Sequence, residues 1–197
     1  MKRLSLAVTI LFCVSLIFGQ SDSYVDFEWD IFRFGYALPF DGDADGGFAF
    51  GGEVRYNATD HFSIGIGGDG AVFGDVIDAS ESEFGITGAS LLLGDYYFTS
   101  SSGKRGFVGI GLGLYSTGSI TVINNNIEEV IEGSTGVGLA PRVGYEFNHI
   151  RLQGQYNLTF KEGQTNYFGV TVALTLWGGY RGGSSGNRAR SNREVLD

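Results

Sequence analysis

The sequence predicts an all-β fold, an eight-stranded antiparallel up-and-down transmembrane β-barrel, and three observations lead to this prediction. Large apolar side chains alternate with small or polar ones along most of the chain, which is typical of strands because successive side chains point to opposite faces. Charged residues and glycines lie at mid-strand, which suits a cramped polar lumen, whereas the bulky aliphatic residues suit a surface solvated by lipid. Beyond the N-terminal segment, the sequence has no apolar run long enough for a membrane helix.

Residues 1–19 are expected to be a cleaved signal peptide. Lys2 and Arg3 precede an apolar run up to Phe18, and Gly19 is the small residue before the expected cleavage. The one cysteine, Cys13, is lost with this segment, so the mature chain can form no disulfide. Without Lys2 and Arg3, 11 basic residues face 22 acidic ones, a net charge of −11 that makes nucleic acid a poor partner.

Eight strands are expected in the mature chain, each long enough to span a bilayer core when tilted. Their ranges are 24–38, 46–57, 61–73, 84–98, 105–118, 134–147, 150–160 and 167–178. Short turns at 57–60 and 148–149 and a moderate connection at 99–104 alternate with longer, mostly acidic segments at 40–46, 74–83, 118–133 and 161–166. This asymmetry is typical of outer-membrane barrels, and an even number of strands places both termini at the periplasmic, short-turn side.

Three of these strands depart from simple alternation. In the first, the outward apolar set shifts by one residue between Ile31 and Phe32, which predicts a β-bulge. In the fourth, Leu91 to Leu93 gives no clear phase, and in the sixth, Pro141 predicts a bulge or an interruption of the ladder. The barrel is expected to occupy residues 20–180, followed by a disordered polar tail at 181–197.

Aromatic residues near the strand ends predict two girdles at the membrane interfaces, because amphipathic rings favour the headgroup level. The girdle residues expected are Tyr24, Tyr36, Tyr56, Tyr96, Tyr97, Tyr115, Tyr145, Tyr167 and Trp177.

Several stretches carry a resemblance to a known family. They are 51–56 leading into 62–67, 96–98 preceding 106–113, and 142–147 leading into 151–156. With these stretches, the region from 24 to 178 resembles the small eight-stranded outer-membrane β-barrels, which include OmpX-like proteins, opacity-type adhesins and the membrane domain of OmpA. The resemblance implies the fold and an outer-membrane location, and it contains no catalytic signature. The C-terminal end of the chain differs from the family, whose members usually end at the last strand, because this chain continues beyond Trp177 and Tyr180.

The best-founded candidate site is a set of charged residues expected to face the lumen. A lumen formed by eight strands is just wide enough to be filled by side chains, so carboxylates and guanidinium groups there are expected to pair. The residues are Glu28, Asp30, Arg33, Glu53, Arg55, Arg142, Glu146 and Arg151, with Asp26 and Asp69 nearer the strand ends.

Two further motifs are candidates for chemistry. Asp41, Asp43 and Asp45, followed by Gly46, match the opening of a calcium-binding loop, although Gly52 stands where that loop needs its final carboxylate. His61 and Ser63 look like the His-x-Ser pair of outer-membrane lipid A deacylases, but alternation places both on the lumen side.

The sequence therefore favours a non-enzymatic, monomeric outer-membrane barrel that needs no cofactor and presents acidic loops for an envelope-structural, adhesion or interaction role. Its expected partners are outer-membrane lipid, the barrel-insertion machinery and an extracellular partner of unknown identity. The alternatives are a narrow conduit for small or hydrophobic molecules, a lipid-modifying enzyme, and a soluble secreted ligand-binding barrel.

Overall fold

The computed structural model describes residues 24–40, 46–78, 81–98, 103–123, 126–131 and 133–180. It contains nine strands in these residues: β1 (Phe27–Pro39), β2 (Gly47–Thr59), β3 (Phe62–Asp78), β4 (Glu81–Tyr97), β5 (Lys104–Ile123), β6 (Asn126–Ile131), β7 (Thr135–Phe147), β8 (Ile150–Thr159) and β9 (Tyr167–Trp177). No helix among the described residues is long and apolar enough to cross a membrane.

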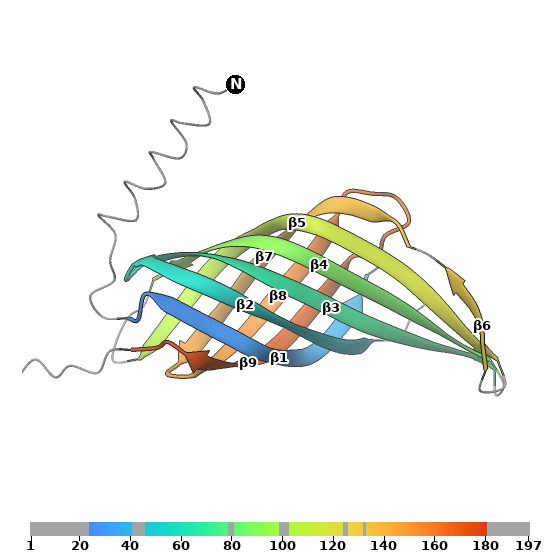
Figure 1. Ribbon diagram of the computed structural model, residues 1–197, viewed down its shortest axis with the longest axis horizontal. Coiled ribbons are helices and arrows are strands. Elements are labelled where there is room, and N and C mark those ends of the chain that lie inside the picture. The colour runs from blue at the N-terminus through green and yellow to red at the C-terminus, as the bar shows by residue number, and fades with distance from the viewer. Residues whose placement is uncertain are drawn as a thin grey trace, which may run out of the picture.

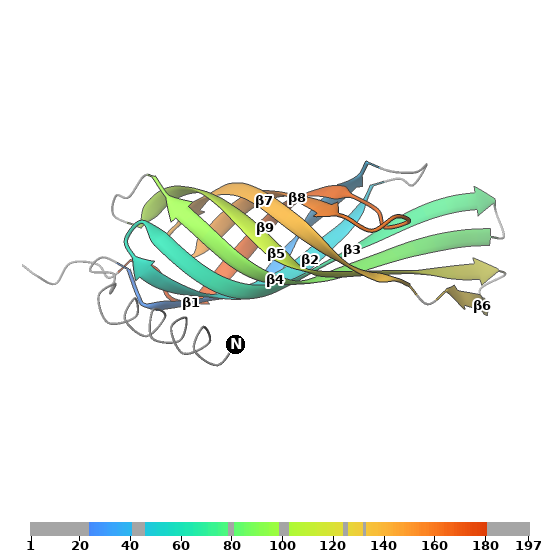
Figure 2. The same ribbon diagram turned by 90° about the horizontal axis from the view of Figure 1, so that it is seen from above.

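Eight of the strands close into a barrel, as Figures 1 and 2 show. Each strand from β1 to β5 pairs with the next, β5 pairs with β7, and β7 to β9 continue the ring until β9 meets β1. Every pairing is antiparallel. The predicted eight-stranded antiparallel barrel is therefore confirmed.

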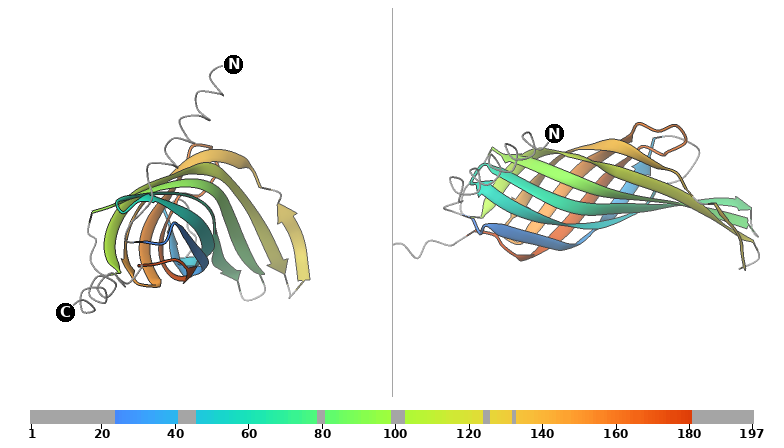
Figure 3. Two further views of the ribbon diagram at one scale, coloured as in Figure 1. Left: turned by 60° about the vertical axis from the view of Figure 1, so that its left-hand side comes forward. Right: turned by 45° about the horizontal axis from the view of Figure 1, so that its top comes forward.

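The largest difference from the sequence-based expectation is a sheet that projects from one end of the barrel. We call it the protruding sheet; it consists of β3 from Phe73, β4 up to Thr87, β5 from Thr117, and β6. β2 accompanies β3 only as far as Val72, and β7 accompanies β5 only as far as Ser116. Beyond these points β3, β4, β5 and β6 pair with one another alone (Figures 2 and 3).

The expectation that segments 74–83 and 118–133 are acidic loops was thus largely wrong. These segments contain many β-branched residues, including Val76, Ile77 and Val122, which favour strands even where carboxylates interrupt the alternation. The expected loop at 161–166 is a connection between β8 and β9.

The two described chain ends meet at the opposite end of the barrel from the protruding sheet (Figure 1). Tyr24 forms an isolated bridge with Tyr180, and the ring centroids are 5.7 Å apart. Gly178 and Gly179 have φ angles of 128° and 95°, which other residues rarely adopt, and they turn the chain at the end of β9. We call this the terminal end of the barrel and the other the sheet end.

The irregular strands behave largely as predicted. The register between β1 and β2 shifts between Asp30 and Arg33, and both Ile31 and Phe32 face outward, which confirms the bulge. In β4, Leu91 and Leu93 are buried while Leu92 is 63% exposed, so this strand does alternate. The ladder from β7 to β8 lacks partners at Ala140 and Pro141 and resumes in the same register at Arg142.

The predicted aromatic girdles need correction. Tyr24, Tyr97, Tyr115 and Tyr167 are buried rather than at a lipid interface. The reason is the alternation of inward and outward residues along each strand: Tyr97, for example, shares the inward face of β4 with Leu91, Leu93 and the buried Asp95. Tyr36, Tyr96 and Trp177 are exposed, as a girdle requires.

Three expectations lie outside the described residues: the signal peptide at 1–19, the acidic run from Asp41 to Asp45, and the tail at 181–197. The calcium hypothesis and the tail therefore stay predictions.

Candidate functional site: a charge network in the lumen

The centre of the lumen is filled by a network of buried charged side chains. The structure brings together all eight charged residues of the sequence-derived set, and each of them is less than 8% exposed. Asp69, expected nearer a strand end, pairs with Arg33 and belongs to the network. Asp26 is only half-buried. The network also contains Asp95 and Arg105, which the sequence analysis missed.

The middle of the network is built around Arg142 on β7. Its Nε and Nη2 atoms donate to the two carboxylate oxygens of Asp95 at 2.8 and 2.7 Å, which is bidentate pairing across the lumen. Its Nη1 atom donates to Glu53 at 2.7 Å, and Arg33 donates to the same Glu53 oxygen at 2.8 Å. Strands β1, β2, β4 and β7 are thus tied together through side chains as well as through the wall.

Toward the terminal end, Glu146 receives three arginines. Arg55, Arg105 and Arg151 all form ion pairs with this one carboxylate. The hydroxyl of Tyr97 accepts hydrogen bonds from Arg55 at 3.1 Å and from Arg151 at 3.3 Å. Since these groups come from β2, β4, β5, β7 and β8, the pairs span the whole width of the barrel.

Aromatic rings close the network at the terminal end. The guanidinium carbon of Arg105 lies 4.0 Å from the ring centroid of Tyr24 and 3.8 Å from that of Tyr97, so the cation is held between two rings. Arg151 lies 3.6 Å from the ring centroid of Phe107 in the same way. These stacked contacts leave both arginines fully buried.

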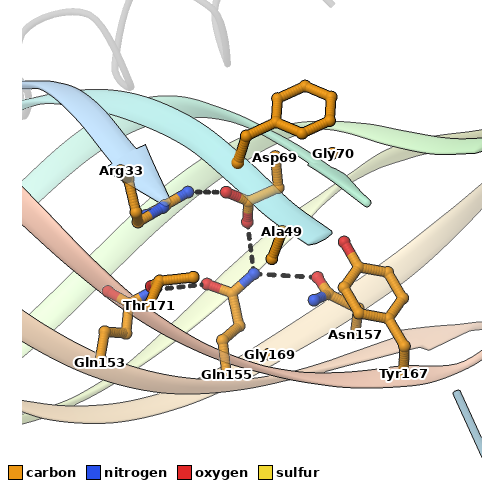
Figure 4. A pocket seen from close by; sticks show the side chains of 11 residues that line it. Arg33, Ala49, Asp69, Gly70, Gln153, Gln155, Asn157, Tyr167, Gly169 and Thr171 are labelled. Carbon is orange, nitrogen blue, oxygen red and sulfur yellow. Dashed lines mark hydrogen bonds and ion pairs between the residues drawn. The ribbon is translucent and has the colours of Figure 1, made fainter. Parts of the chain in front are cut away.

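Toward the sheet end, charge gives way to a ladder of amides on the inner face of β8. Arg151 donates to Gln153 at 3.2 Å, Gln153 donates to Gln155 at 2.9 Å, and Gln155 donates to Asn157 at 2.9 Å. Gln155 also donates to Asp69. Tyr115 donates to the same amide oxygen of Asn157 at 3.0 Å, and this ladder borders the cavity in Figure 4.

The loop between β8 and β9 is fixed at the sheet end by Gln164. Its side-chain amide donates to the backbone oxygen of Ser134 at 2.7 Å and to that of Tyr115 at 3.2 Å. These carbonyls lie where β5 leaves β7 and turns to pair with β6. Gln164 thus binds the loop between β8 and β9 to the backbone next to the start of the protruding sheet.

The outer wall is apolar where the lumen is charged. On β5, Val108, Ile110, Leu112 and Leu114 are 47–56% exposed, while Arg105 and Phe107 on the inner face are fully buried. The same division holds on β9, where Val170 to Leu176 expose every second residue. The surface that meets the surroundings is therefore a belt of aliphatic and aromatic side chains.

His61 and Ser63 contact different atoms of the same residue, Tyr97. The Nδ1 atom of His61 lies 2.9 Å from the backbone oxygen of Tyr97, and the Ser63 hydroxyl lies in the lumen, 3.4 Å from the Tyr97 hydroxyl. Within the described residues, no group of three or more His, Cys, Asp or Glu side chains could hold a metal ion.

Two residues of the network escaped the sequence analysis for identifiable reasons. Asp95 belongs to β4, whose phase the run of three leucines obscured, although Leu91, Leu93, Asp95 and Tyr97 do follow a period of two. Arg105 stands at the expected beginning of a strand, where a charge is usually solvated. Its two-residue spacing from Phe107 is the signal that places it inside.

Comparison with known proteins gives a likeness of fold. No family model matches the chain, and no curated protein sequence matches it. Ail, the attachment invasion locus protein of Yersinia pestis, matches with a TM-score of 0.51 and 11% identity over 80% of this chain and 97% of Ail. Neisserial surface protein A matches with a TM-score of 0.49 and 13% identity over 77% of this chain and 97% of its own. The outer membrane protein OprG from Pseudomonas aeruginosa matches with a TM-score of 0.48 and 14% identity over 82% of this chain and 97% of its own.

The chain thus has the fold of the small eight-stranded outer-membrane β-barrels, and the resemblance seen in the sequence is confirmed at the level of fold.

Proposed function

We propose that this protein is a non-enzymatic outer-membrane barrel with a plugged lumen, which holds the protruding sheet outside the cell as an interaction surface. The observation that carries the proposal is the protruding sheet. At about 3.3 Å per residue, the 17 residues of β3 extend roughly 56 Å, whereas a strand tilted by about 45° needs roughly 42 Å to cross a bilayer core of about 30 Å. A structural wall alone needs no such extension.

The apolar belt supports the membrane location. Exposed residues such as Phe34, Leu92, Ile110 and Val172 would be costly in water, and a closed ring of strands leaves no unpaired edge within the lipid. The short turns then lie in the periplasm together with both termini, and the protruding sheet lies outside.

The composition of the protruding sheet supports a role in interaction. Its segments carry six acidic residues and neither lysine nor arginine: Asp75, Asp78, Glu81, Glu83, Glu128 and Glu129. A projection of acidic composition favours basic or cation-rich partners. The name of Ail, an attachment and invasion protein, agrees with such a role but does not establish it.

The filled lumen favours an interaction role over that of a conduit for small molecules. The pairs around Glu53, Arg142 and Glu146 cross the barrel from strand to strand and leave the centre filled. A lipid-modifying role is not favoured either, because His61 and Ser63 contact different atoms of Tyr97 and the Ser63 hydroxyl lies in the lumen.

An epitope test checks location and orientation. A short epitope inserted between β3 and β4 should be bound by antibody on intact cells. The matched control is the same epitope between Asn148 and His149, in the turn from β7 to β8, which should be bound only after the outer membrane is permeabilised. Equal access at both sites, or recovery of the protein in the soluble fraction, would contradict the proposal.

A second experiment tests the role of the protruding sheet. A variant that joins β3 to β4 near Phe73 and Thr87, and β5 to β7 near Ser116 and Thr135, keeps the barrel and removes the projection. Cells producing it should show a normal heat-dependent gel shift of the barrel but lose adhesion to polycationic and cell-coated surfaces. Unchanged adhesion would mean that the protruding sheet does not mediate the interaction.

A further inference from the structure

A small cavity lies inside the lumen between the charge network and the sheet end (Figure 4). Its volume is about 20 Å³, which is room for one water-sized sphere. Its lining includes the polar side chains of Asp69, Gln153, Gln155, Asn157, Tyr167 and Thr171. Arg33 also borders it and is engaged by Asp69 and Glu53.

The charges of the network do not balance. Within the described residues, every arginine belongs to the network, which gives the five guanidinium groups of Arg33, Arg55, Arg105, Arg142 and Arg151. They face six carboxylates, those of Glu28, Asp30, Glu53, Asp69, Asp95 and Glu146. One negative charge is left over among buried side chains, where an uncompensated charge is strongly unfavourable.

Asp69 is the acid of the network that borders this cavity. Its ion pair is with Arg33 alone, whereas Glu53, Asp95 and Glu146 each contact two or more arginines. Asp30 also has one arginine, but it does not border the cavity. A singly paired acid and a space the size of one water molecule therefore coincide beside Asp69.

One oxygen at the cavity has no hydrogen-bond partner in the structure. The hydroxyl of Thr171 is buried and unpaired, and the residue is only 8% exposed. A buried polar atom of this kind needs a partner, and a hydroxyl oxygen can accept a cation as well as a hydrogen bond. Carboxylate, amide and hydroxyl oxygens together form the donor set that hard cations prefer.

We propose that this cavity binds one small monovalent cation, with sodium as the ion to test, and that the ion balances the excess negative charge of the lumen. One carboxylate at the cavity and one uncompensated charge in the network call for a single positive charge, which disfavours a divalent ion. A sodium ion also fits a space the size of one water molecule. The cation would therefore be part of the folded barrel, whatever binds at the protruding sheet.

The test is the denaturant unfolding of the purified full-length barrel in liposomes, with sodium chloride replaced by N-methylglucamine chloride at constant ionic strength and pH. The unfolding equilibrium constant should fall tenfold for each tenfold rise in sodium concentration above half-saturation, because one ion binds the folded state alone. Asp69→Asn should remove this dependence. The variant should also be at least as stable as the wild type in sodium-free buffer, since its network is balanced.

Two further variants keep the proposal testable if Asp69→Asn fails to fold. Thr171→Val keeps the shape and the charge excess but removes one oxygen, and it should raise the half-saturating sodium concentration at least tenfold. Glu162→Gln, at an exposed loop carboxylate, should leave the sodium dependence unchanged.

Three outcomes would overturn the proposal. Wild-type stability that ignores sodium would mean that the cavity holds water only. A dependence retained in both Asp69→Asn and Thr171→Val would place the ion elsewhere. Stability that rises on acidification and ignores sodium would assign the missing positive charge to a proton.

Discussion

Arg142→Leu should destabilise the barrel strongly. The Arg142 side chain is fully buried and makes three charge-assisted hydrogen bonds of 2.7 to 2.8 Å, two to Asp95 and one to Glu53. Its loss leaves Asp95 with Arg151 as its remaining cation. Removing one partner of a buried pair costs about 3–5 kcal/mol, because the other charge stays buried without compensation.

That loss can be measured as a shift in the denaturation midpoint. With a slope of about 2 kcal/mol/M, the urea midpoint should fall by roughly 1.5–2.5 M. Lys104→Leu is the matched control, because Lys104 is exposed at the start of β5, and its effect should stay within about 0.5 kcal/mol. The double variant Arg142→Leu with Asp95→Leu should recover part of the loss, because both partners are removed. An Arg142→Leu barrel that unfolds at the wild-type midpoint would refute the argument that the lumen depends on paired charges.

Four other predictions follow from the same account. Planar-bilayer recordings of the wild-type barrel should show no large steady conductance, because the charge network fills the lumen; a stable open channel would favour the conduit. Deleting Ile31 should be tolerated, because it removes the residue of β1 that is extra relative to β2 and brings the outward residues on either side into one phase, whereas deleting Gly35 should abolish the heat-dependent gel shift by reversing the faces of β1. If Asp41, Asp43 and Asp45 bind calcium, millimolar calcium should protect that segment from protease, and Asp43→Asn should remove the protection. Deleting residues 181–197 should leave barrel assembly in liposomes intact, because the segment is almost without apolar residues.

Alternation of side chains was enough to predict the barrel, because a period of two assigns each residue to one face without knowledge of its neighbours. It also predicted the bulge, since a slip from Ile31 to Phe32 cannot occur in a regular strand. Most of the lumen charges followed from the same alternation, although Asp95 and Arg105 were missed. Which carboxylate meets which arginine did not, because Arg142 and Asp95 are paired by the closure of the barrel and not by sequence distance.

The protruding sheet could not be predicted in the same way. Its segments mix acidic and β-branched residues, and the rule that acidic stretches form loops outweighed the strand preference of residues such as Val122 and Ile127. Pairing between β5 and β6 supplies the stabilisation that neither segment has alone. The burial of Tyr97 and Tyr115 was missed for a related reason, since an aromatic residue near a strand end suits both a girdle and a lumen.

The central claim is that the apolar outer wall faces lipid and the charged inner face is closed to water. The most direct test is spin-label accessibility along β5, with a single cysteine introduced in turn at each residue from Phe107 to Leu114 in a variant that lacks Cys13, the one native cysteine. Val108, Ile110, Leu112 and Leu114 should be accessible to molecular oxygen and protected from a water-soluble nickel complex, while the alternate positions should be protected from both reagents. Nickel access at the outward positions would mean that the barrel is soluble, and nickel access at the inward positions would mean that the lumen is open.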